Sequence, residues 1–401
     1  MDIRLQRKLL YKIRHMKNFF VSDNETNAYA EKLLHYSFHS NSSIEMKAEL
    51  VQVKPLIQDD DYLVLKKIKE IYYNNAQSFK SEDKADIWQN YIIPKHKNFL
   101  NHLKNNDDDA ALSFLNNMFS NDAGYGFVSP LPNPDSKKSN DAIKLLHMDS
   151  LVNFAEWLGV IPVENYEQNV WGNSVCMDPD YIIDLIEKKL GFEIKFPAFY
   201  PGLFGIKTKR GVFFYRDFIY LYIALKVQEY CSFKTNPSIL EIGGGAGLLA
   251  YYCNMLCLKN VSIVDIPTVN LISAYFLMKN LPEREFLFNY DETKYTNDNS
   301  IKLLIPESFH DAPDNQYDIT INCDSLPEVN AIDVEKYLSK MTQTSSLFYS
   351  INQEAGGEMW GLGTNQNIIP AIIEKTGGFT RKSRNLFWLR RGYVEELYKI
   401  N

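Results

Sequence analysis

A run of glycines between two short apolar segments constrains this chain more than any other feature. Residues 239–242 read ILEI, which is typical of a buried strand in a parallel sheet. Residues 243–247 read GGGAG, and an apolar helical pattern then runs over 248–258. A second apolar run at 261–264 ends in Asp265. This order of strand, glycine turn, helix, strand and acid predicts one half of a nucleotide-binding α/β unit.

The spacing of the acids and glycines indicates which ligand the turn holds. A dinucleotide fingerprint would need a glycine at 248, where the chain has Leu248. Glu241 is followed instead by glycines at 243, 245 and 247, a pattern that resembles the Rossmann-like S-adenosylmethionine-dependent methyltransferases. An acid on the strand suits a ligand with an ammonium and a sulfonium, and Asp265 is placed for both ribose hydroxyls. A glycine turn that holds no ligand is the alternative.

Composition narrows the class of protein. The chain has 401 residues, 45% of them hydrophobic and 23% charged, which is ordinary for a globular protein with a large core. Its net charge of −7 and the absence of a long basic block disfavour nucleic acid as substrate. Five scattered cysteines without metal spacing fit a reducing compartment, so we expect a cytoplasmic protein. No apolar run is long enough to predict a transmembrane helix.

The chain divides into three predicted regions. Residues 1–120 show helical spacing, for example at 62–72 and 87–92, with an acidic helix start at 59–61. Residues 121–235 begin with a loop rich in Gly and Pro at 121–137, which we interpret as a lid, followed by helices that form a substrate platform. An irregular aromatic stretch then leads into an amphipathic helix that starts at Arg216. Residues 236–401 form the cofactor-binding domain.

The last region completes an α/β fold of the class I methyltransferase type. Apolar runs at 301–305, 318–323 and 346–352 predict three further parallel strands, with helices between them. Residues 379–389 and 393–398 predict a terminal antiparallel hairpin that turns at Arg391-Gly392. The expected fold is therefore a Rossmann-like sheet of parallel strands with a C-terminal antiparallel hairpin, preceded by a largely helical N-terminal domain.

Several segments also resemble one family. FYPGLFGIKTKRGVFFYRDFIYLYIALKV, LEIGGGAGLLA, VDIPTVN, NCDSLPEV and SINQEA occur in that order between about 140 and 375. Together they are similar to the bacterial sugar O-methyltransferase family found with genes of surface-polysaccharide biosynthesis. The resemblance implies methyl transfer from S-adenosyl-L-methionine to a sugar hydroxyl, on a sugar nucleotide or a surface glycan.

Polar residues that follow the strands are the candidates for chemistry, because ligands of open α/β sheets bind at the carboxyl ends of the strands. Methyl transfer to a hydroxyl needs the reacting atoms in line and a base for the hydroxyl proton. The catalytic candidates are Asp324, Glu328, His310 and Glu354. Each has a plainer alternative: a turn cap for Asp324, a helix-start acid for Glu328 and a surface histidine for His310.

The residues expected to bind the cofactor form a larger set than the catalytic candidates. Arg216 suits the carboxylate of the cofactor or an anion of the substrate, with a helix-start salt bridge as the alternative. Mg²⁺ is an open alternative if Asp324, Glu328 and Glu354 converge, although no metal ligands are assigned. The expected cofactor-binding residues are Glu241, Gly243, Gly244, Gly245, Gly247, Asp265, Ile266, Ser308, Asp324, Ser325 and Arg216.

Two other functions compete with sugar methylation. One keeps the cofactor but changes the acceptor to a small-molecule or natural-product hydroxyl or amine. The other is a non-catalytic methyltransferase-like scaffold, which the retention of Glu241, the glycines and Asp265 disfavours. The partners that we expect are a sugar or glycan acceptor and no nucleic acid, and a homo-oligomer is compatible with the sequence.

Overall fold

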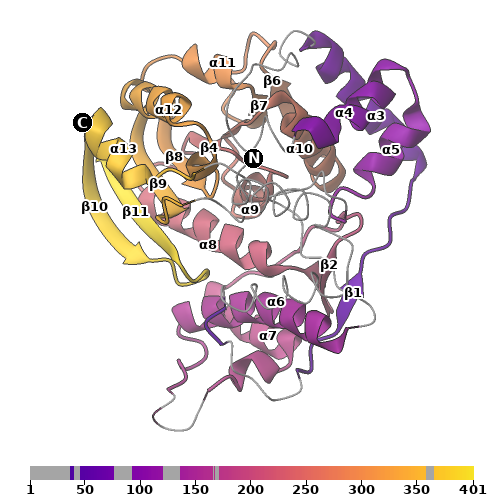
Figure 1. Cartoon of the computed structure of the whole chain (residues 1–401), viewed down its shortest axis with the longest axis vertical. Helices are drawn as coiled ribbons and strands as arrows, with labels where there is room; N and C mark the ends of the chain where they lie inside the picture. The colour runs from indigo at the N-terminus through magenta and orange to yellow at the C-terminus, as the bar shows by residue number, and fades with distance from the viewer. Residues whose placement is uncertain are drawn as a thin grey trace, which may run out of the picture.

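The fold is built on one large mixed sheet with helices on both faces (Figure 1). The computed structural model describes residues 37–39, 46–75, 93–120, 136–165, 167, 171–357 and 365–401. The strands of the large sheet are β4 (Ile239–Ile242), β5 (Val261–Val264), β6 (Glu285–Phe288), β7 (Ser300–Leu304), β8 (Tyr317–Cys323), β9 (Ser345–Gln353), β10 (Phe379–Leu386) and β11 (Tyr393–Ile400).

The strand order confirms the predicted fold class. The order is β10-β11-β9-β8-β4-β5-β7-β6, and all neighbours are parallel except β11, which is antiparallel to both β9 and β10. This is the Rossmann-like methyltransferase sheet with its antiparallel C-terminal hairpin. The chain leaves β4 toward β5 and later returns to its other side through β8, so the switch point lies at β4. The short edge strand β6 was not predicted, because its four residues carry little period-2 signal.

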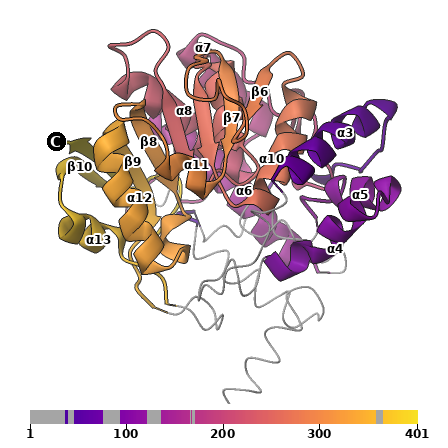
Figure 2. The same ribbon diagram turned by 90° about the horizontal axis from the view of Figure 1, so that it is seen from above.

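Helices cover the two faces of the sheet with separate apolar cores (Figure 2). In β4, Leu240 and Ile242 face the core shared with α11, α12 and α13, whereas Ile239 faces the core shared with α8, α9 and α10. Since side chains alternate along a strand, Glu241 points to the α8 side. The helices of this half are α8 (Tyr215–Tyr230), α9 (Leu248–Met255), α10 (Pro267–Asn280), α11 (Pro306–His310), α12 (Ala331–Thr344) and α13 (Ile369–Thr376).

Helix α8 differs from the amphipathic helix that the sequence predicts. Its residues from Arg216 to Ala224 are all buried, because α8 contacts α9 on one side and α6 (Lys137–Trp157) on the other. Apolar side chains of α8 and of the large sheet therefore pack into one continuous core. The polar members of this stretch are consequently held by internal contacts rather than by water.

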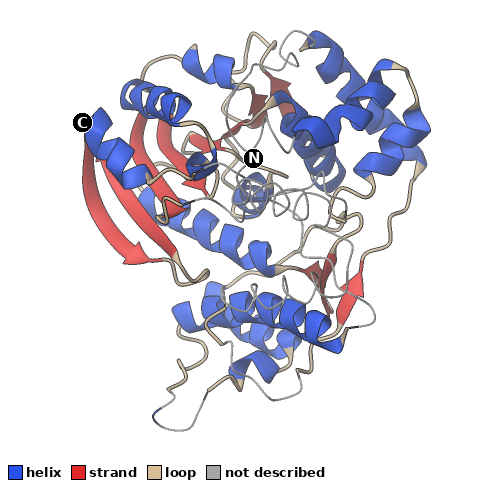
Figure 3. Ribbon diagram, in the orientation of Figure 1, coloured by secondary structure: helices blue, strands red, loops and turns tan. Residues whose placement is uncertain are grey.

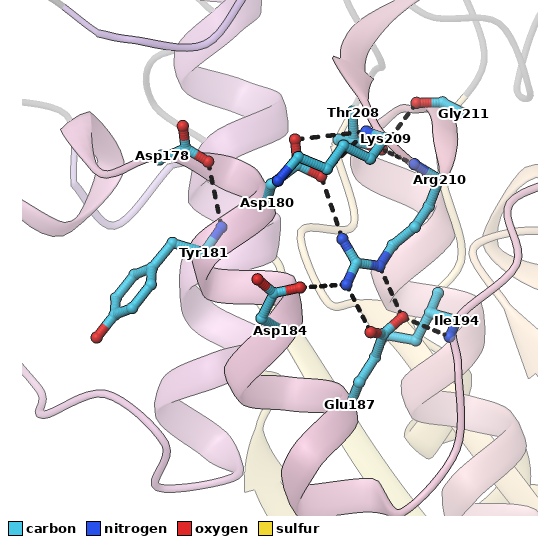
Figure 4. A network of polar contacts seen from close by, with 10 residues as sticks. All are labelled: Asp178, Asp180, Tyr181, Asp184, Glu187, Ile194, Thr208, Lys209, Arg210 and Gly211. Carbon is cyan, nitrogen blue, oxygen red and sulfur yellow. Dashed lines mark hydrogen bonds and ion pairs between the residues drawn. The ribbon is translucent and has the colours of Figure 1, made fainter.

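A small antiparallel sheet fixes the segment that leads into α8. β1 (Leu50–Gln52) pairs with β2 (Phe204–Thr208), and β2 pairs with β3 (Gly211–Phe213), where the sequence predicted irregular structure. Arg210, in the β2–β3 turn, contacts three acids of α7 (Pro179–Leu190) (Figure 4). Its Nε lies 2.8 Å from Glu187 Oε1, and its Nη1 lies 3.2 Å from Asp180 Oδ1. The hairpin is thereby anchored, and its last residue, Phe213, directly precedes Phe214, the N-cap of α8.

The N-terminal helices attach to the sheet half through α10. α3 (Asp59–Asn74) begins at the predicted acidic start, and α4 (Ile93–Lys104) and α5 (Asp108–Leu115) lie beside it (Figure 3). Asp61 of α3 is fully buried, where it accepts a hydrogen bond from Tyr275 Oη at 2.8 Å and lies 2.8 Å from Lys279 Nζ. Both partners belong to α10.

Two sequence predictions fall outside the described residues. These are the helical pattern at 87–92 and the lid at 121–137, of which only 136 and 137 are described. The proposed domain boundaries remain predictions. No helix within the described ranges has the length and apolar character needed to cross a membrane.

Candidate active site

Backbone geometry in the loop after β4 depends on glycine. Gly243, Gly245 and Gly247 have φ values of +74°, +55° and +88°, a region that side chains with a Cβ rarely adopt. A Cβ on Gly243 would overlap the side chain of Ser325, and one on Gly247 would approach Leu277 Cδ1 to 2.7 Å. The close packing of the loop against Ser325 and Leu277 therefore requires glycine at these positions.

Asp265 closes the loop from the neighbouring strand. Its Oδ2 accepts a hydrogen bond from the Gly245 N–H at 3.0 Å, and its Oδ1 accepts one from the Ile266 N–H at 2.8 Å. Burial raises the pKa of Asp265 to about 7, although the two N–H groups favour the charged form. A carboxylate oxygen has two lone pairs, so each oxygen can accept a further hydrogen bond from a ligand hydroxyl.

Glu241 lies beneath the loop with its carboxyl group buried. Among the described residues, neither of its side-chain oxygens has a hydrogen-bond partner. Burial, together with the nearby Asp265, raises its pKa well above the usual range. A buried polar group without a partner is costly, and a ligand that donates hydrogen bonds or brings positive charge would relieve the cost. Glycines with positive φ and a buried carboxyl without a partner thus fit the ammonium- and sulfonium-bearing cofactor that the sequence predicts.

Asp324 follows the end of β8, on the side of β4 opposite to β5. The residues around it form the second half of the candidate site, and the glycine loop with Glu241 and Asp265 forms the first half. Asp324 adopts φ +68°, and its N–H bonds to Ile351 O at 3.0 Å and to Asn352 Oδ1 at 3.1 Å. Its carboxylate accepts hydrogen bonds from Arg390 Nη1 and from Tyr393 Oη, both at 2.5 Å. Arg216 Nη2 lies 3.8 Å from the same Oδ2 that Arg390 contacts. Strands β8, β9 and β11 and the start of α8 therefore meet at one residue, Asp324.

Ser325 joins the two halves. Its Oγ donates to Ile242 O at 3.0 Å and accepts from Asn322 Nδ2 at 2.5 Å. Asn322 also donates to Ile242 O at 2.9 Å. The end of β8 is thus fixed directly against the turn into the glycine loop.

The start of α8, which carries Arg216, is held by α6. The Tyr215 N–H donates to His147 Nδ1 at 3.1 Å, and Ser150 Oγ donates to Tyr215 O at 2.6 Å. Burial lowers the pKa of His147 to about 3, which keeps the ring neutral and able to accept. Arg216 Nε in turn donates to Tyr215 Oη at 2.9 Å. Arg216 is therefore oriented before any ligand arrives.

Three predicted catalytic residues lie in different surroundings from Asp324. Glu354 forms a bidentate pair with Arg384 of β10, with both N–O distances 2.7 Å, and Arg384 lowers its pKa. Both oxygens of Glu354 are thereby engaged by one guanidinium group of the edge strand β10. His310 lines a surface hollow with residues of α12, and its ring contacts Tyr337. Glu328 ends a 3₁₀ turn, Leu326–Glu328, and its N–H donates a hydrogen bond to Ser325 O at 3.0 Å. Of the three residues, it is the one closest to Asp324 along the chain.

Two further residues predicted to bind the cofactor also differ in their surroundings. Ile266 contacts Asp265 as described, whereas Ser308 lies in α11, where its carbonyl accepts a hydrogen bond from Tyr295 Oη. The open alternative of a Mg²⁺ site at Asp324, Glu328 and Glu354 gains no support: among the residues that the structure describes, no three acids, histidines or cysteines are grouped so that they could hold a metal ion. Two of these carboxylates pair with different arginines instead, Glu354 with Arg384 and Asp324 with Arg390.

Sequence reasoning missed Arg390, Tyr393, Asn322 and Asn352. The two asparagines stand inside the NCDSLPEV and SINQEA segments, so the family resemblance carried a signal for them. Arg390 and Tyr393 flank the predicted hairpin turn, and no local pattern shows that β11 inserts between β9 and β10. That insertion brings the turn to the end of β8.

Comparisons with known proteins find fold likeness alone. No protein-family model matches the chain, and no curated protein matches it. Similar solved structures include a candidate RNA methyltransferase from Pyrococcus horikoshii, 17% identical, covering 46% of this chain and 82% of that one at a TM-score of 0.30. Magnesium protoporphyrin IX methyltransferase from Synechocystis, with bound S-adenosylhomocysteine, is 10% identical and covers 46% and 83% at 0.33. The bifunctional kinase-methyltransferase WbdD is 10% identical and covers 46% and 38% at 0.32.

Proposed function

We propose that this chain is an S-adenosyl-L-methionine-dependent methyltransferase that transfers a methyl group to a sugar hydroxyl. The observation that carries the cofactor is the contact between Asp265 and Gly245 beside the unpaired carboxyl of Glu241. Because the likenesses above cover less than half of the chain at low TM-scores, the proposal rests on the chain's own residues.

Each residue of the first half has a role toward the cofactor. Asp265 would accept hydrogen bonds from the two ribose hydroxyls, and Glu241 would face the positive end of the ligand. The Gly243–Gly247 backbone would form the surface on which the ligand lies, and Ser325 would close that surface from β8. When bound, the cofactor supplies an electrophilic methyl group on a sulfonium.

Asp324 is the residue that we propose as the general base. Its carboxylate would accept the proton of the acceptor hydroxyl as the oxygen bonds to the methyl carbon. A carboxylate has about four lone-pair positions, so contacts with Arg390 and Tyr393 leave room for a hydroxyl. Arg216 and Arg390 would keep the carboxylate oriented during the transfer. Glu328 is the second candidate for the base.

The sugar acceptor rests on the segments around Asp324 and Asn352 that resemble the sugar methyltransferases. Labelled S-adenosylmethionine, incubated with a panel of sugar nucleotides and glycans, tests the acceptor. Transfer to a small aromatic hydroxyl or an amine, and not to any sugar, would contradict the sugar assignment. Calorimetric titration with S-adenosylhomocysteine tests the cofactor separately, since a non-catalytic scaffold that has lost the site would show no binding.

A further inference from the structure

Helix α8 directs one of its faces to the carboxyl ends of the central strands. Arg216 Nη2 lies 3.8 Å from Asp324 Oδ2, so the first turn of α8 lies at this edge of the sheet. Residues four apart share a helix face, which places Tyr220 one turn further along on the same face as Arg216. Long side chains in a helix lean toward its N-terminus, so the Tyr220 side chain is directed back toward Arg216 and the same edge.

The Tyr220 side chain meets side chains of two neighbouring strands. Tyr220 and Cys323, the last residue of β8, belong to the core on the α8 side of the sheet, and Glu241 of β4 points to that side. Burial raises the pKa of Tyr220 well above its usual range, and the thiol of Cys323 and the carboxyl of Glu241 raise it further. Because the effect of a charge weakens with distance, the hydroxyl of Tyr220 lies in the neighbourhood of Glu241.

The Tyr220 hydroxyl has an unused capacity for hydrogen bonds. It forms none with any residue that the structure describes, although the side chain is buried. Tyr222, two residues further along α8, is equally buried but donates a hydrogen bond to Glu395 at 2.8 Å. A buried tyrosine hydroxyl usually has a partner. Since the carboxyl of Glu241 also has none among the described residues, α8 and β4 each supply one unpartnered polar group here.

We propose that the Tyr220 hydroxyl binds the ammonium group of the cofactor together with Glu241. An ammonium group has three N–H donors, and both a hydroxyl oxygen and a carboxylate can accept them, whereas a sulfonium has no N–H to donate. The inference rests on the proposed function and adds a binding residue on α8 to those of the glycine loop. Arg216, one turn nearer the helix start, remains the candidate for the cofactor carboxylate, so the amino-acid end of the cofactor would be held from both α8 and β4.

The test compares two probes that differ in the amino-acid end. The full chain is titrated with S-adenosylhomocysteine, which carries the ammonium group, and with methylthioadenosine, which has the same nucleoside part but no amino-acid end. The proteins are wild type, Tyr220→Phe and Tyr222→Phe. Tyr222→Phe is the matched control, because it removes the same buried hydroxyl from the same helix where the partner is Glu395 of β11. Thermal denaturation shows whether each variant is folded, and Tyr220→Met replaces Tyr220→Phe if the latter does not fold.

We expect Tyr220→Phe to bind S-adenosylhomocysteine roughly tenfold more weakly than wild type, as expected for loss of a hydrogen bond to a charged group. Its affinity for methylthioadenosine should equal that of wild type, because this probe has no ammonium group. Tyr222→Phe should bind both probes as wild type does.

Equal affinity of wild type and the folded Tyr220 variant for S-adenosylhomocysteine would overturn the inference. A parallel loss for methylthioadenosine, or an equal loss in Tyr222→Phe, would also overturn it, because the effect would then not involve the ammonium group. Failure of wild type to bind S-adenosylhomocysteine at all would overturn the proposed function, and this inference with it.

Discussion

At the ends of β4 and β5, carboxyl groups face main-chain N–H groups and glycines, whereas at the ends of β8, β9 and β11 one carboxylate faces two guanidinium groups. The first half gathers its residues from one short stretch, 241 to 266. The second gathers Arg216, Asp324, Arg390 and Tyr393 from distant parts of the chain. Most of the proposed cofactor site is thus built from a local stretch, while the proposed acceptor site draws on distant parts of the chain.

The largest expected effect is on the acceptor half. Asp324→Asn keeps the shape of the side chain but removes the proton acceptor, so turnover should fall by roughly 10²–10⁴-fold. Affinity for S-adenosylhomocysteine should change little, which separates the two halves. Single-turnover rates and a binding titration on the same protein provide the measurements. Near wild-type turnover would move the base elsewhere, and Glu328→Gln would be the next variant.

The cofactor half should respond in the opposite way to Asp265→Ala. Charge-assisted hydrogen bonds contribute about 1.5–3 kcal/mol each, so the loss of the two proposed ribose contacts should weaken S-adenosylhomocysteine binding by tenfold or more. Calorimetric titration measures this change. If affinity were unaffected while the variant stayed folded, Asp265 would not be a cofactor ligand.

The pH dependence of cofactor binding gives a smaller effect with a defined sign. The pKa of Asp265 is raised to about 7 by burial, and the charged form is the one that accepts both hydroxyls. Affinity should therefore rise with pH through about 7, by up to about tenfold per unit below it, and level off above it. Titrations at pH 6 and pH 8 test this. Glu241 would act in the same direction, so Asp265→Asn should flatten the dependence in part, and a flat wild-type profile would contradict the prediction.

The smallest effect should come from Glu354, which lies in neither half. Glu354→Gln removes a partly exposed ion pair with Arg384, so stability should fall by no more than about 1 kcal/mol. Turnover should stay close to wild type, because the carboxylate is already engaged at the edge strand β10. A steady-state assay and denaturant unfolding check both statements. A large loss of turnover in a folded variant would return Glu354 to the catalytic candidates.

The contrast between the local and the long-range half of the site explains which of its residues the sequence predicts. Strand, glycine turn and acid follow one another within a few residues, so spacing alone places Gly243, Gly245 and Asp265 correctly in the fold. Arg390 reaches Asp324 only because β11 pairs with β9 in one register, which no local pattern encodes. Glu354 follows a strand at the expected edge, yet it is bound by Arg384 of β10, which is not adjacent to β9 in the sheet. Contacts set by register and by buried charge thus limit prediction from a single sequence.

The contact between α3 and α10 bears on how the chain can be divided. α10 is a rod of 14 residues, about 20 Å long, that starts beside Asp265 and ends against the N-terminal helices. Lys279 is only 6% exposed in its side chain, with Asp60 and Asp61 as its anionic partners. A fragment cut after α5 would strip this lysine of both counter-ions and leave the apolar side of α10 facing water. We therefore expect the sheet region to be less stable when it is separated from the N-terminal helices.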